Sequence, residues 1–189
     1  MLGSKSRFAQ ECFDGGFVGT DFEIEQDLTG RLAEDWREFN REFIPIYRAA
    51  RPDKTKIGAG LACGALWTVS KGIKIGDILL CPDGNGRYRV AEVTGEYYYS
   101  PNNILPHRRP VRWLDLTIDR AAISDQLKST TGSVGTVVHI KHANRKELEQ
   151  LLSGSGLPLD GGGSPIEREL VEDVGAFAME AHLEEFLIK

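Results

Sequence analysis

The chain has 189 residues, of which 41% are apolar and 27% are charged, as in globular domains with a hydrophobic core. No apolar run approaches the ~18 residues of a membrane span, and the first residues carry no secretory signal, so we expect a cytoplasmic protein with no membrane partner. The net charge of −5 argues against a simple basic nucleic-acid binder. The charge is uneven, however, because residues 51–120 hold 11 basic and 7 acidic groups (+4), whereas residues 154–189 hold 2 and 8 (−6).

In chain order, residues 7–24 are rich in aromatic residues and glycine, which predicts one or two short strands with a turn at Gly15-Gly16. The next segment, residues 33–50, predicts a helix that Pro45 should kink or divide. Its apolar residues recur with helical spacing as one stripe, formed by Trp36, Phe39, Phe43, Ile46 and Tyr47.

Residues 55–71 are small and apolar, which predicts a tightly packed helix that passes into a strand near Trp67. The turn-forming residues 82–86 predict a hairpin. Alternating apolar positions predict four strands, at Asp77–Cys81, Tyr88–Thr94, Val111–Ile118 and Gly135–Ile140. A helix over Lys141–Leu152 is expected to close the unit.

The Gly/Ser-rich residues 153–165 predict a flexible linker, and residues 166–189 predict an acidic amphipathic helix. We therefore expect one domain over residues 1–152, followed by the linker and the start of a second domain that the chain does not contain. A homodimer could form through this last helix or through the missing domain.

The motifs of common enzymes are missing, including the acid and lysine pattern of restriction nucleases, so we expect no catalysis by this chain. The three cysteines, Cys12, Cys63 and Cys81, form no CxxC pair and no cluster with histidine. We expect them to be buried apolar residues, and we expect neither a metal nor a cofactor.

The segment from Tyr97 to Arg112 joins three consecutive tyrosines to a cluster of basic residues. Side chains alternate along a strand, so at least one tyrosine should reach the surface. Aromatic rings next to arginines suit stacking on bases and pairing with phosphates. The alternative is a loop held in place by its own aromatic residues and prolines.

Trp67 lies among small residues, which leave room for a flat group against its ring. Such an aromatic wall can hold a flipped base. The alternative is an ordinary core tryptophan.

Four segments of this chain together carry a family resemblance, namely residues 58–67, 74–80, 88–99 and 105–114. In this order they resemble the N-terminal region of Mrr/NucS-type restriction endonucleases, over roughly residues 10–150, and also the PUA-superfamily readers that include EVE and YTH domains. Residues 177–187 resemble the first helix of the nuclease domain that follows in such enzymes.

The resemblance implies an α+β fold, with a small twisted PUA/EVE-like β-barrel flanked by helices. It implies that the domain flips a modified, for example methylated, DNA base into an aromatic pocket, as the recognition part of a restriction endonuclease. The residues expected at the pocket are Cys63, Ala65, Trp67, Tyr97, Tyr98, Tyr99 and Trp113. The residues expected on the DNA backbone are Lys56, Lys71, His107, Arg108, Arg109 and Arg112.

Two alternatives stay open at this point. The same fold could bind RNA or sense a small ligand, or the domain could serve only in oligomerisation. The double-stranded DNA partner is therefore an expectation.

Overall fold

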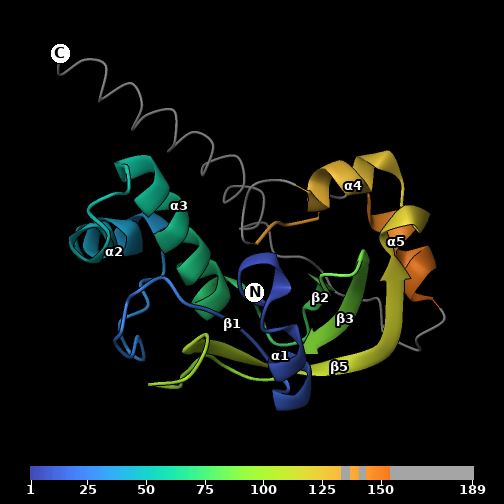
Figure 1. The fold of residues 1–189 in the computed structure, drawn as a ribbon, viewed down its shortest axis with the longest axis horizontal. Helices are drawn as coiled ribbons and strands as arrows, with labels where there is room; N and C mark the ends of the chain where they lie inside the picture. The colour runs from blue at the N-terminus through green and yellow to red at the C-terminus, as the bar shows by residue number, and fades with distance from the viewer. Residues whose placement is uncertain (133–136, 141–143, 154–189) are drawn as a thin grey trace, which may run out of the picture.

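The computed structural model describes residues 1–132, 137–140 and 144–153. A curled antiparallel sheet forms a half-barrel at the centre, with one group of helices at either end (Figure 1). The predicted α+β class, with a twisted sheet and flanking helices, is thereby confirmed. The predicted linker, apart from Ser153, and the predicted helix over residues 166–189 lie outside the described residues.

The longest strand, β5, organises the sheet. It runs over His107–Asp119 and pairs with three other strands, and the order is β1-β5-β3-β2 with β4 also on β5. The strands that pair with β5 are β1 (Phe17–Thr20), β3 (Arg87–Val93) and β4 (Tyr98–Tyr99), while β2 (Ile78–Pro82) pairs with β3. The register between β3 and β5 shifts between Arg89 and Ala91, and such an irregularity bends a strand.

The predicted hairpin is confirmed, because β2 and β3 pair across residues 83–86. Asp83 holds this turn by accepting hydrogen bonds from the backbone nitrogens of Asn85 (2.7 Å) and Arg87 (3.2 Å). The third predicted strand is also confirmed, but β5 begins four residues earlier, at His107. The fourth, Gly135–Ile140, is wrong where it can be compared, because residues 137–140 form no strand; residues 135 and 136 lie outside the described part.

The N-terminal prediction was half right. Residues 17–20 form a strand as expected, but Ala9–Gly15 form a helix, α1, after a short 3-10 turn at Ser4–Ser6. Gly16 takes a φ of 64°, a conformation that ends the helix and turns the chain into β1. A helix of only seven residues shows too little periodicity to be recognised in the sequence.

Two helices pack as a pair at one end, α2 (Trp36–Ala50) and α3 (Lys56–Trp67). The side chain of Asp35 caps α2 and that of Thr55 caps α3 by accepting from backbone N–H groups. α2 continues through Pro45 as one helix. The predicted strand near Trp67 is wrong, because α3 runs instead into a π-helical turn over Thr68–Gly72.

At the opposite end, a 3-10 turn (Arg120–Ala122) leads to α4 (Asp125–Thr131), which lies near α5 (Arg145–Leu152). The helix predicted over Lys141–Leu152 is thus confirmed in its described part, Arg145–Leu152.

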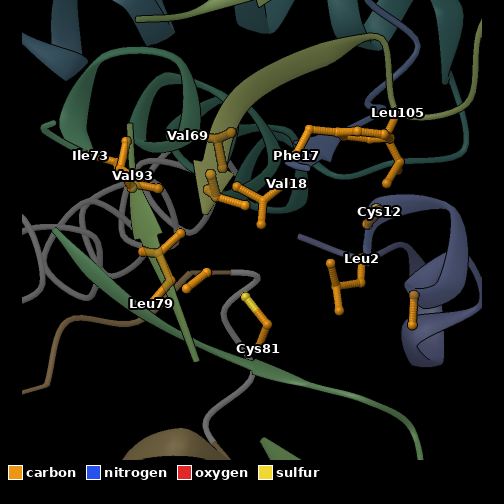
Figure 2. Packing of buried hydrophobic residues seen from close by; sticks show 13 residues of the cluster. Leu2, Cys12, Phe17, Val18, Val69, Ile73, Leu79, Cys81, Val93 and Leu105 are labelled. Atoms are coloured by element: carbon orange, nitrogen blue, oxygen red, sulfur yellow. The ribbon is translucent and has the colours of Figure 1, made fainter. Parts of the chain in front are cut away.

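Three clusters of buried side chains hold these parts together. The first packs residues of β1, β2, β3 and β5 against the N-terminal residues, α1 and the π-helical turn; Figure 2 labels ten of its side chains, Leu2, Cys12, Phe17, Val18, Val69, Ile73, Leu79, Cys81, Val93 and Leu105. The second joins α2 and α3 to Ile24 and Leu28, and the third packs the other face of β2 and β3, together with the second half of β5, against α4 and α5. The three cysteines are buried as expected, and burial raises the pKa of Cys12 to about 11 and that of Cys63 and Cys81 to about 12.

The stripe on α2 gives a direct test of this packing. Phe43 is fully buried and stacks on Phe39 at 4.2 Å, whereas Ile46, which was expected on the same face, is 37% exposed. Phe43→Ala should lower the free energy of unfolding by about 3–5 kcal/mol, and Ile46→Ala by less than about 1 kcal/mol. Chemical denaturation followed by circular dichroism measures both, and equal losses would contradict the packing.

Candidate ligand pocket

One pocket of the molecule combines buried polar atoms with basic side chains. It is an open depression with a volume of about 380 Å³. Four segments that are distant in the sequence supply its walls: residues 29–32, the π-helical turn with residues 73 and 74, the loop between β3 and β4, and β5. Its polar lining consists of Thr29, Ser70, Lys71, Lys74, Glu96 and Arg109.

Arg109 is the most unusual of these residues, because its side chain is only 1% exposed. Its Nε donates to the carbonyl of Gly95 (3.0 Å) and its Nη1 to the carbonyl of Ser70 (3.3 Å). Within the described part of the chain, neither Arg109 Nη2 nor Ser70 Oγ has a hydrogen-bond partner. A buried donor without a partner costs free energy, so these two atoms mark a place where a ligand could bind.

The charge of Arg109 is also poorly compensated. The carboxylate in its ion pair, Glu96, approaches only to 3.9 Å, and the side chain of Glu96 is 81% exposed. Burial lowers the pKa of Arg109, while Glu96 and Asp77 act in the opposite direction. A guanidinium keeps its proton in proteins, so a buried positive charge lies beside the pocket at neutral pH.

Two lysines add to the positive charge of the pocket. Lys71 pairs with Glu34, which lowers the pKa of Glu34, and it also donates to the carbonyl of Leu32 (3.3 Å). Lys74 is exposed, and its Nζ donates to the carbonyl of Lys71 (3.1 Å). With Glu96 as the one acid that lines the pocket, the lining has three cations against one anion.

Tyr97 forms an aromatic part of the wall and is held by a chain of hydrogen bonds. Its hydroxyl accepts from the backbone nitrogen of Leu28 (3.2 Å) and lies 3.0 Å from Nδ1 of His107. Nε2 of His107 lies 2.7 Å from the carbonyl of Ile24, which can only accept, so this nitrogen carries the proton. Burial lowers the pKa of His107, which favours the neutral ring, in which Nδ1 accepts from the Tyr97 hydroxyl.

The residues predicted for the aromatic pocket do not form one site. Of these residues, only Tyr97 lines the pocket described above. Trp67 is 4% exposed in the α2–α3 core and donates from Nε1 to the carbonyl of Ala33 (2.9 Å), while Cys63 is fully buried in the same core. Trp113 packs edge-on to Phe13 and donates to the carbonyl of Cys12 (2.9 Å).

Three further residues of that prediction lie elsewhere. Tyr98 is 37% exposed and Tyr99 packs against the ring of His107 at 5.2 Å. Ala65 is partly buried on α3.

The residues predicted to contact the DNA backbone also lie in different parts of the structure. Arg109 and Lys71 meet at the pocket, but His107 is fully buried and so is not accessible to a phosphate. Arg108 lies over the ring of Phe17 at 3.8 Å and donates to two backbone carbonyls, of Leu105 and Ile104.

The other two lie away from the pocket. Arg112 is exposed on the sheet and pairs with Glu92. Lys56 borders a different groove beside α2, with Pro45 and Arg48.

Ser70, Lys74 and Glu96 complete the pocket and were not predicted. Ser70 gives no local signal, because only the π-helical turn places its carbonyl and hydroxyl beside β5. The basic pair Lys71 and Lys74 directly before the first hairpin is the one signal in the sequence that could have pointed to this place.

A family model described as a domain of unknown function (DUF8426) matches residues 1–141. The chain belongs to this family. The matched region contains every residue that lines the pocket of this DUF8426 domain. No curated protein and no solved structure matched the chain.

Among the described residues, no helix is long and apolar enough to cross a membrane. Across residues 1–132, 137–140 and 144–153, no three side chains of His, Cys, Asp or Glu are grouped so that they could hold a metal ion.

Trp67→Ala tests whether this tryptophan belongs to the core. We expect a loss of about 3–5 kcal/mol in the free energy of unfolding, because the variant empties a packed site and leaves the Ala33 carbonyl without its donor. Denaturant unfolding measures the loss. A stability equal to that of the wild type would place Trp67 in an open site instead.

His107 should make stability depend on pH. Its pKa in the folded state lies below the unfolded value of about 6.5, so the unfolded chain binds more protons as the pH falls through that value. The free energy of unfolding should therefore fall between pH 6.5 and 5, by at most about 1.4 kcal/mol per pH unit.

Denaturation curves across this pH range provide the measurement. His107→Gln should flatten the dependence, whereas the control His139→Gln, at an exposed position, should retain it. The same slope in both variants would contradict the role of His107.

Proposed function

We propose that this domain is a non-catalytic DNA-binding module that accepts a nucleotide, turned out of the duplex, into the Arg109 pocket. The observation that carries this proposal is the combination of a buried guanidinium and a buried hydroxyl, each with an unpartnered atom, at a pocket with two lysines. Charged and polar donors that converge on one cavity are what recognition of a nucleotide requires.

The distribution of charge supports a nucleic-acid partner. The net +4 of residues 51–120 includes Lys71, Lys74 and Arg109, so the pocket lies in the basic part of an otherwise acidic chain. Cations at the entrance to the pocket would contact phosphates, and such contacts supply much of the affinity of proteins for DNA.

The ring of Tyr97 supports the part of the proposal that concerns the base. It lines the pocket and is held in place by Leu28 and His107, so it could stack on a base without first having to be ordered. Stacking is worth about 1–3 kcal/mol per base, and a hydrogen bond to a charged group about 1.5–3 kcal/mol. Together they can offset the few kcal/mol that turning out a nucleotide costs.

The fold is compatible with this function. A curled sheet flanked by helices is the architecture that the resemblance to PUA-like EVE and YTH readers implies. We extend the proposal to recognition of a modified base, as the reading part of a restriction endonuclease. In this version of the proposal, Tyr97 takes the stacking role for which the sequence favoured Trp67.

Fluorescence anisotropy with labelled duplexes tests the proposal. Lys74→Ala should weaken binding to every duplex and reduce the slope of log affinity against log salt concentration by about 1, because one phosphate contact is lost. Lys128→Ala is the matched control, since this lysine lies on α4 at the opposite end of the molecule (Figure 1). Equal effects of the two variants would contradict the pocket as the DNA site.

A panel of duplexes that differ in one modified base, with an RNA duplex as competitor, tests the ligand. Tighter binding to one modified duplex than to plain DNA supports the reader function. Equal binding to all the DNA duplexes contradicts base reading, and stronger competition by RNA favours the RNA-binding alternative.

A further inference from the structure

We infer that the Arg109 pocket binds a phosphoryl oxyanion between Arg109 and Ser70, and that Glu96 is the counterion that this oxyanion displaces. The inference deepens the proposed function and rests on it only in that both concern the same pocket. It names the chemical group that the pocket receives.

The hydrogen-bonding capacity of the two buried side chains is the first argument. Two carbonyls already hold the guanidinium of Arg109 at Nε and Nη1, which leaves Nη2 as a donor in a fixed position. The hydroxyl of Ser70 is a second donor without a partner, and the carbonyl of the same residue accepts from Arg109. Both residues line the same pocket, and two unpartnered donors at one pocket suit a group with more than one acceptor oxygen, such as a phosphoryl group.

The charge of the pocket is the second argument. A buried cation is stabilised by a close anion, but the carboxylate of Glu96 reaches only to 3.9 Å from Nη1. An oxyanion within hydrogen-bond distance of Nη2 would compensate the charge better than Glu96 does. The ammonium group of Lys74, at the same pocket, adds to the attraction.

The exposure of Glu96 is the third argument. Its side chain is 81% exposed, so it can turn into solvent at little cost when an anion arrives. Until then, its negative charge repels that anion. Replacing Glu96 with glutamine should therefore increase the affinity for an oxyanion, which is the opposite of what loss of an ordinary binding residue does.

DNA contains two kinds of phosphate group that could bind at this pocket. An internal phosphodiester presents two non-bridging oxygens and a terminal phosphate presents three, and the two groups differ in charge. Oligonucleotides with and without a 5′-phosphate distinguish the two, because only the terminal phosphate would make their affinities differ.

Titration calorimetry with inorganic phosphate, at low ionic strength and without DNA, tests the inference on the full chain. We expect saturable binding to the wild type. Glu96→Gln should bind phosphate about 2- to 5-fold more tightly, since an exposed ion pair of this kind is weak. Ser70→Ala should bind about 10-fold more weakly, because it loses a hydrogen bond to a charged group.

Two controls separate a specific change in phosphate affinity from a change in folding or in overall charge. Both variants change small or exposed groups, so their unfolding curves should match that of the wild type; Lys128→Ala should leave phosphate affinity unchanged. Absence of saturable phosphate binding to the wild type, or equal affinity in wild type, Glu96→Gln and Ser70→Ala, would overturn the inference.

The experiments distinguish failure of the oxyanion site from failure of the DNA-binding function. If phosphate binds and the variants respond as expected, but Lys74→Ala leaves DNA affinity unchanged, the oxyanion site stands and the DNA-binding function fails. If Lys74→Ala weakens DNA binding while phosphate alone does not bind, the oxyanion site fails and the DNA-binding function stands.

Discussion

The structure depends on the burial of two polar side chains, His107 and Arg109, on the same face of β5. Alternate residues of a strand point to the same side, and this half of β5 is enclosed by β1 on one edge and β4 on the other. A buried imidazole and a buried guanidinium must find hydrogen-bond partners. Their partners come from outside the sheet: the carbonyl of Ile24, the hydroxyl of Tyr97 and the carbonyl of Ser70. These bonds connect the sheet to the segment before α2 and to the turn after α3.

His107 and Arg109 differ in what their surroundings leave unsatisfied. Both ring nitrogens of His107 have partners, and its bonds hold Tyr97 at the wall of the pocket. Arg109 retains an unpartnered nitrogen and a distant carboxylate, beside an unpartnered hydroxyl of Ser70. Structural residues in natural proteins rarely leave such donors unused, which is why the proposals above centre on Arg109. Trp67 has the opposite character, because its ring is packed and its Nε1 is satisfied.

Features that depend on neighbours in the sequence could be predicted from it. The β2–β3 hairpin follows from two apolar strands around a turn of proline, aspartate, asparagine and glycine, and α2 follows from its apolar stripe. The predictions failed where distant contacts decide the outcome. Residues 107–110, which include Pro110, form a strand because β1 and β4 pair with them. The segment from Tyr97 to Arg112 was expected to contact DNA, but His107 and Arg109 are buried because β1 and β4 pair with this part of β5.

The sequence by itself therefore determined the α+β class, the main hairpin, the buried cysteines and the presence of Tyr97, Lys71 and Arg109 in a basic region. The hairpin, the buried cysteines and the basic region follow from local pattern, composition or charge, which are properties of neighbouring residues, whereas the α+β class follows from the predicted helices and strands together with the family resemblance. Only the tertiary structure decided that Arg109 is buried, that Ser70, Lys74 and Glu96 join it, and that Trp67 belongs to the core. The physical reason is that burial and hydrogen-bond satisfaction depend on which distant segments meet, and four such segments meet at this pocket.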